Sequence, residues 1–158
     1  MGTWRSLPDI ARKRWCAAAR DRVILSGHLP PSRPGRRIVI DGDVIDGRRG
    51  FYCALGEAIN GPGGYFGMSL RAVEDCLYGG FGLEFPYTIV WRNSAQSRAV
   101  LDASALRECL HEEREPLDVE VHEEGGIPVD GRTLFDEILA LLMCVSEQRD
   151  GALKVTLL

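Results

Sequence analysis

Two adjacent acids, Glu74 and Asp75, are the residues of this chain best placed to do chemistry. They fall in the stretch YFGMSLRAVEDCL, residues 65–77, where an aromatic turn containing glycine leads into a short helix. The apolar positions of this helix recur at spacings of three and four, which predicts that both carboxylates lie off its buried face. Exposed carboxylates bind cations, arginine above all, because one carboxylate accepts two parallel hydrogen bonds from a guanidinium. A solvated helix surface is the alternative interpretation of the same pattern.

No pattern in the sequence indicates an enzyme or a metal site. The motifs HExxH, GxSxG and GxxxxGK are absent, and the one repeated acidic cluster is HEE, at residues 111–113 and 122–124. A histidine with two acids can hold a cation, but solvated acidic surface gives the same pattern. Asp41, Asp43 and Asp46 are better explained as turn and cap residues than as catalytic carboxylates. We therefore expect no catalytic residue, no metal and no cofactor.

The composition indicates one globular domain with additions. Of the 158 residues, 45% are hydrophobic and 27% charged, a balance typical of a protein with a packed core. No stretch approaches the roughly 18 consecutive apolar residues that cross a membrane, and no early apolar segment is typical of a secretion signal. The five cysteines form no CxxC pair, and an odd number cannot all pair within the chain, which favours a reducing compartment. We expect a cytoplasmic protein that does not bind membranes.

Charge divides the chain into a basic beginning and an acidic remainder. Residues 1–36 hold eight Lys or Arg and two acids, whereas residues 37–158 hold eleven and twenty-one, which gives +6 and −10. An acidic body repels nucleic acid and attracts cationic partners. The basic segment allows two interpretations, contact with RNA or an arm that folds back on the acidic body. We predict an N-terminal extension with a proline-rich linker at 1–36, and a domain at 37–158 with an acidic insertion at about 102–130.

Strands and helices alternate along residues 37–158, the order that builds a parallel sheet through right-handed crossovers. Apolar strands are predicted in RIVID, YTIVW and LKVTLL. Between them, the spacing of Phe51, Leu55 and Ile59 predicts a helix with one buried face. Besides the short helix that Ser69 begins, further helices are expected over 104–113 and after residue 130, and a hairpin over 118–131. The expected N-caps of the helices are Asp46, Ser69 and Asp130.

The stretch at residues 65–77 resembles the recognition helix of the barstar family, the small intracellular inhibitors of microbial ribonucleases. The tripeptide EFP at 84–86, the strand ending in VWR at 90–92 and the closing LKVTLL follow in the family's order. The resemblance covers roughly residues 37–101 and 131–158. It implies an α/β fold with a three-stranded parallel sheet packed by helices, with Trp91 and Pro86 in the core. It also implies a binding protein, not an enzyme.

The same resemblance implies where the partner binds. In barstar-like inhibitors an acid at the position of Asp75 enters the ribonuclease active site and dominates binding, because its carboxylate imitates an RNA phosphate for the surrounding arginines. The aromatic ring at the position of Tyr65 packs against the enzyme, with simple core packing as the alternative. The implied partner is one small microbial ribonuclease, barnase-like or otherwise guanyl-specific. The implied partner-binding residues are Tyr65, Ser69, Arg71, Glu74, Asp75, Tyr78, Gly79, Glu84 and Glu147.

The recognition helix also departs from the family pattern. Arg71 stands where the best-known member has an acid, Glu74 where it has tryptophan, and Ser69 where it has asparagine. The match of Glu147 depends on an alignment that can slide by one residue onto Ser146. Arg71 precedes Asp75 by four residues, a spacing that permits an ion pair of about 0.3–0.5 kcal/mol. Two functions therefore stay open: inhibition of a ribonuclease, or a barstar-like interaction module for a different toxin or a regulatory protein.

Overall fold

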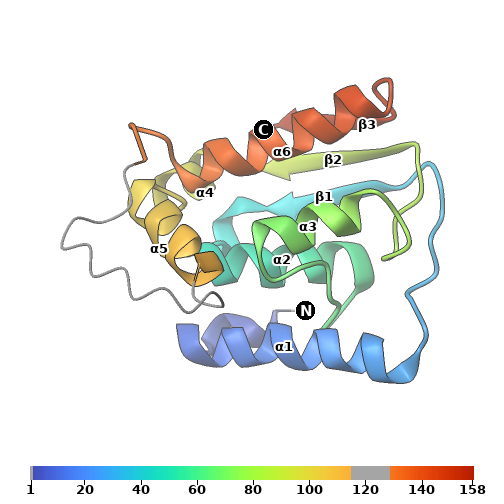
Figure 1. Cartoon of the computed structure of the whole chain (residues 1–158), viewed down its shortest axis with the longest axis horizontal. Helices are drawn as coiled ribbons and strands as arrows, with labels where there is room; N and C mark the ends of the chain where they lie inside the picture. Colours follow the sequence, from blue (N-terminus) through green and yellow to red (C-terminus); the bar gives the residue numbers. More distant parts are fainter. Residues whose placement is uncertain (1, 115–128) are drawn as a thin grey trace.

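The computed structural model describes residues 2–114 and 129–158. Three parallel strands form one sheet in the order β1 (Arg37–Asp41), β2 (Tyr87–Arg92) and β3 (Leu153–Leu157) (Figure 1). In the central strand, Ile89 pairs with Ile38 on one side and Val155 on the other. The predicted three-stranded parallel sheet is therefore confirmed.

Helices connect the strands, as parallel pairing requires. Between β1 and β2 lie η2 (Gly42–Val44), α2 (Arg48–Asn60) and α3 (Leu70–Leu77). Between β2 and β3 lie α4 (Ser94–Val100), α5 (Ala103–Arg114) and α6 (Leu134–Gln148).

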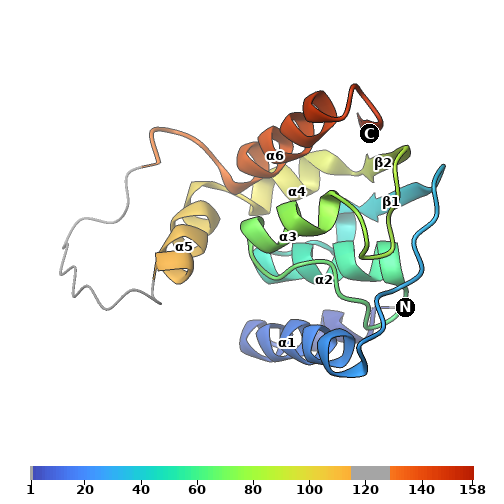
Figure 2. The ribbon, with the colours of Figure 1, turned by 45° about the vertical axis from the view of Figure 1, so that its right-hand side comes forward.

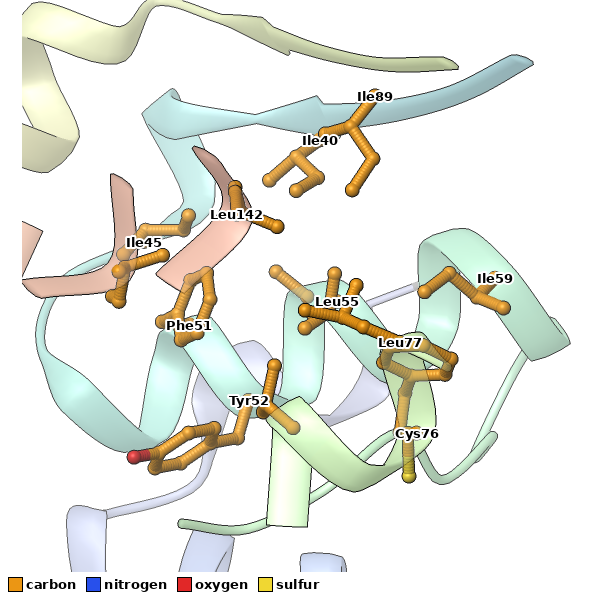
Figure 3. Close-up of a cluster of buried hydrophobic side chains, with 14 of the residues drawn as sticks. Ile40, Ile45, Phe51, Tyr52, Leu55, Ile59, Cys76, Leu77, Ile89 and Leu142 are labelled. Atoms are coloured by element: carbon orange, nitrogen blue, oxygen red, sulfur yellow. The ribbon is translucent and has the colours of Figure 1, made fainter. Parts of the chain in front are cut away.

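The core is built where the sheet meets α2, α3 and α6. Figure 3 shows Ile40 and Ile89 pointing from the strands toward α2, whose Phe51 and Leu55 face them. Trp91 of β2 is fully buried between aromatic rings, with Phe51 at 5.5 Å and Phe135 of α6 at 5.0 Å between ring centroids. Its indole Nε1 donates to Ser97 Oγ at 2.9 Å, which satisfies its one polar group. The expectation that Trp91 is a core residue is confirmed.

The N-terminal extension folds back on the body of the protein. It forms η1 (Thr3–Ser6) and α1 (Asp9–Ser26), and α1 lies along α2 on the side away from the sheet in both views (Figures 1 and 2). Trp4 is fully buried, and Cys16 and Ala19 join the same core. Of the two interpretations of the basic segment, the structure has the arm that folds back.

Buried polar bonds join this extension to α2. The carboxylate of Glu57, which is itself buried, accepts from Trp4 Nε1 at 3.1 Å and from the backbone N–H of Gly2 at 3.0 Å. The guanidinium of Arg12 donates to the carbonyls of Trp4 and Arg5 and to Asp46. Arg12 and Glu57 thus each have a partner from the other segment, so a substitution that removes the partner would leave the charge buried and unpaired.

Several local predictions are wrong, each for a physical reason. Asp46 does not cap α2, whose N-cap is Gly47, because its carboxylate pairs with Arg12. Asp130 does not cap α6, since Thr133 accepts from the N–H of Asp136 and performs that role. Pro86 is exposed, at the start of β2. Helix α2 is buried on nearly every side, not on one face, because α1 covers the face opposite the sheet.

The acidic region is described only in part. The helix expected over 104–113 is confirmed as α5. All but the last three residues of the expected hairpin at 118–131 lie outside the described residues. The second HEE cluster lies outside them as well. In the described part of the chain, all five cysteines are free, and Cys144 is the exposed one.

Glu112 fastens α5 to the first two long helices. Its carboxylate accepts from Arg48 at 2.9 Å and from Arg49, with Lys13 of α1 at 3.7 Å. The hydrogen bond from Arg48 lowers the pKa of Glu112 from 4.5 to about 2, and the charges of Arg48, Arg49 and Lys13 act in the same direction. Because the folded pKa is the lower one, this contact stabilises the protein above pH 4.5 and is lost as the pH falls toward 2.

We expect Glu112→Gln to be less stable than wild type at pH 7 and to lose less stability between pH 5 and pH 2. Free energies of unfolding from urea titrations across that range give both quantities. Glu108→Gln removes an exposed carboxylate one turn earlier on α5 and controls for the change in net charge. If the free energy of unfolding falls equally between pH 5 and pH 2 in the two variants, Glu112 is not the group that causes the loss of stability in acid.

Candidate functional site

Helix α3 is short, and the residues around it fix where it starts and how it points. Ser69 is its N-cap, with Oγ accepting from the N–H of Ala72 at 3.1 Å, as predicted. Gly67, two residues earlier, has φ +88°, and a Cβ there would lie 2.6 Å from the backbone nitrogen of Val73. Only glycine allows both that backbone angle and that approach. Val73, Cys76 and Leu77 are buried against the core, so the helix has a defined outer face.

The outer face of α3 carries the two acids singled out by the sequence. Asp75 is exposed and Glu74 is half-buried. Arg71 is exposed one turn before Asp75, and Tyr78 lies three residues after it, so the four side chains share one surface. Neither carboxylate forms an ion pair or a hydrogen bond with another described residue. The structure thus presents Asp75 to solvent on a helix whose other face is locked in the core.

The ion pair that the spacing of Arg71 and Asp75 permits is not formed. Within residues 2–114 and 129–158, no nitrogen of Arg71 lies within 4.0 Å of an Asp75 oxygen. The pairing would have gained only a few tenths of a kcal/mol at such an exposed position. Asp75 therefore keeps its charge available for a partner.

Tyr65 belongs mostly to the core. It is 9% exposed, its ring lies edge-on to Phe81 at 6.2 Å, and burial raises its pKa to about 12. Its carbonyl accepts from Asn60 Nδ2 at 2.7 Å, which ties the aromatic turn to the end of α2. Of the two interpretations of Tyr65, core packing accounts for nearly all of its surface, and a partner can reach only a thin edge of the residue.

Tyr78 connects α3 to the end of α6. Its hydroxyl donates to Gln148 Oε1, and Arg149 places its guanidinium 5.3 Å from the Tyr78 ring and 5.2 Å from that of Phe85. Glu147, which precedes Gln148, is exposed, and its carboxylate forms no hydrogen bond or ion pair with the residues of α3. The end of α6 therefore adjoins the outer face of α3 and extends the surface on that side.

The remaining predicted residues surround the helix. Gly79 has φ +116° and ends α3, and its N–H donates to the carbonyl of Cys76 at 3.2 Å. Glu84 is exposed in the loop that leads to β2. The structure thus brings Arg71, Glu74, Asp75 and Tyr78 together, with Ser69 and Gly79 as the ends of their helix, and leaves Tyr65 largely beneath the surface.

The arrangement suits recognition by charge more than it suits catalysis. Four of the predicted site residues carry carboxylates and one is an arginine, so the surface attracts a cationic partner. Among the described residues, no three His, Cys, Asp or Glu side chains gather in a geometry that could hold a metal ion. None of the helices described has the length and apolar character needed to cross a bilayer.

Sequence reasoning missed that α1 borders this site. Arg22 of α1 donates to the carbonyl of Gly63, and Arg20 approaches Met68 Sδ at 3.8 Å, so α1 touches the segment that leads into α3. The signal was present, because Arg12, Cys16, Ala19 and Val23 recur at helical spacing on one face of α1. This helical pattern is weakly apolar, because three of its four positions hold an arginine, a cysteine and an alanine.

A comparison with family models identifies the class of protein. Residues 36–128, more than half of the chain, match the model of the family described as barstar, the barnase inhibitor. The protein belongs to the barstar family. The match includes most of the acidic insertion and stops before α6 and β3, whereas the resemblance noted in the sequence skipped the insertion and resumed at residue 131. A search of curated proteins gave no match.

Proposed function

We propose that this protein is a cytoplasmic inhibitor that binds one small microbial ribonuclease and blocks its active site with Asp75. The observation that carries the proposal is the position of Asp75: it is exposed, pairs with no residue that the structure describes, and is held on a capped helix packed into the core. A ribonuclease active site holds cationic side chains that bind the phosphates of RNA. A carboxylate fixed in advance on a rigid helix offers those cations two acceptor oxygens and loses little entropy on binding.

Family membership supports the same function. The family takes its description from an inhibitor of barnase, and the acidic body of this chain complements a cationic enzyme. Free cysteines throughout agree with a reducing compartment such as the cytoplasm. Protection of the producing cell from its own ribonuclease is the biological role that follows. In this role the protein acts by binding and carries out no reaction.

The proposal is tested by titrating a panel of small microbial ribonucleases with the protein while RNA cleavage is followed. We expect cleavage by at least one enzyme to stop at one equivalent of protein, since one α3 blocks one active site. The complex should then have the mass of a one-to-one pair. Full activity of every enzyme at excess protein would contradict the proposal.

A second candidate function uses the same face of α3 to bind a partner that is not a ribonuclease. Arg71 is exposed on the same face as Asp75 and pairs with no described residue, so the face offers a cation as well as carboxylates. Such a mixed face suits a toxin without ribonuclease activity, or a regulatory protein, that presents both charges. Capture of a partner that binds through Asp75 and lacks ribonuclease activity would favour this candidate.

A further inference from the structure

The C-terminal part of α1 and the turn after it contact the segments that flank α3, the helix on which the proposed function rests. Arg20 contacts Met68, the residue before the N-cap of α3, at 3.8 Å. Nine residues later, Leu29 places its Cδ1 3.9 Å from where a Cβ on Gly80 would be, just past the end of α3. These two contacts lie on either side of α3, whose length is about 12 Å.

This stretch exposes large apolar side chains. Ile24 is 65% exposed and Leu29 is 54% exposed. Ile24 lies one turn after Arg20 and so on the same side of α1, toward Met68. We call Ile24 and Leu29 together the α1 rim. Leu25 is also exposed, at 85%, but it points about 100° further round the helix, away from Arg20.

One of the last two cations before Ile24 on α1 is compensated by a neighbouring acid. The guanidinium of Arg20 is held by the carboxylate of Asp21 through two hydrogen bonds, at 3.0 and 2.9 Å. Arg22 donates to the carbonyl of Gly63, on the segment before α3. The charge of Arg20 is thus compensated by Asp21, whereas Arg22 keeps its positive charge.

Interface size requires more surface than α3 provides. A stable protein interface buries about 800 Å² on each partner, from roughly 20–30 residues. Helix α3 has 8 residues, of which Val73, Cys76 and Leu77 are buried. A partner that covers Asp75 must also cover neighbouring elements. The segment from Arg20 to Leu29 contacts the chain on both sides of α3, and it exposes the large apolar side chains of the α1 rim.

We infer that the α1 rim is part of the ribonuclease-binding surface and packs against apolar surface beside the enzyme's cationic cleft. Its effect would be twofold. Burying Ile24 and Leu29 removes apolar surface from water. It also excludes water from the ion pairs made by Asp75, which strengthens them, since charges attract more strongly where water is absent.

The test compares three proteins against a ribonuclease that the wild type inhibits: Ile24→Ser/Leu29→Ser, Leu25→Ser as the matched control, and Asp75→Ala. All changed side chains are exposed, and urea unfolding of each variant verifies that the fold is kept. We expect the double variant to bind at least tenfold more weakly, mainly through faster dissociation, and the Leu25 variant to bind within twofold of wild type.

Each other outcome would overturn the inference in a distinguishable way. If the double variant binds as tightly as wild type and Asp75→Ala binds more weakly, the interface does not include α1, and the proposed function stands. If the free wild type is a dimer that the double variant loses, the rim binds a second copy of this chain. If the wild type binds no ribonuclease, the proposed function fails and this assignment of the rim fails with it.

Discussion

Asp75→Ala is expected to weaken binding to the cognate ribonuclease by about two to four orders of magnitude. Truncating one member of a desolvated charge pair costs about 2–5 kcal/mol at protein interfaces, because the other charge is left buried without a partner. The enzyme's cations would be left in that state. Dissociation constants from inhibition of RNA cleavage or from calorimetry give the change directly.

The control for Asp75 is Glu108→Ala, which removes one exposed carboxylate from another helix and changes the net charge equally. Loss of a diffuse electrostatic attraction would affect both variants alike and would fade at high salt. Loss of a specific pair affects Asp75→Ala alone. If Asp75→Ala binds within twofold of wild type, the phosphate-mimic mechanism is wrong.

Trp4→Ala is expected to destabilise the protein by about 3–5 kcal/mol. Trp4 of η1 is fully buried, and replacing a core tryptophan with alanine removes apolar contacts and leaves a cavity. It also removes the indole N–H that donates to the buried carboxylate of Glu57. Against the roughly 5–15 kcal/mol that folds a typical domain, such a loss is large. Urea unfolding of the full chain measures it.

Two further variants separate the contributions of Trp4. Trp4→Phe keeps most of the apolar volume and deletes the hydrogen bond to Glu57, so about 1–3 kcal/mol of the loss should remain. Thr3→Ala changes an exposed neighbour and should shift stability by less than about 0.5 kcal/mol. If Trp4→Ala unfolds at the same urea concentration as Thr3→Ala, the extension is a dispensable addition.

The sequence predicted the elements that have strong periodicity and missed the contacts that do not depend on it. The strands of the sheet and the buried side of α3 follow from runs of apolar residues, and both are confirmed. The N-caps at Asp46 and Asp130 were wrong because several polar residues near a helix start can serve as the cap, and tertiary contacts decide among them. Asp46 pairs with Arg12, a residue 34 positions earlier.

The sequence predicted part of the candidate site and missed the rest. The position of Asp75 on the outer face of α3 followed from helical spacing alone. The burial of Tyr65 did not, because an aromatic residue in a glycine-containing turn can point either way until its neighbours are known. The border formed by α1 was missed because Arg12 and Glu57, which fasten the extension to α2, are charged and do not count as core residues in an apolar pattern.

The order of the strands has a consequence for synthesis on the ribosome. The central strand β2 pairs with β1, which precedes it, and with β3, which follows only after α4, α5 and α6 have been made. At roughly 5–20 residues per second, β2 keeps one edge unpaired for several seconds in the nascent chain. An unpaired edge is a template for association with other chains. Helix α3 lies between β1 and β2 in the sequence, so the residues proposed to bind the ribonuclease emerge before the sheet beneath them is complete.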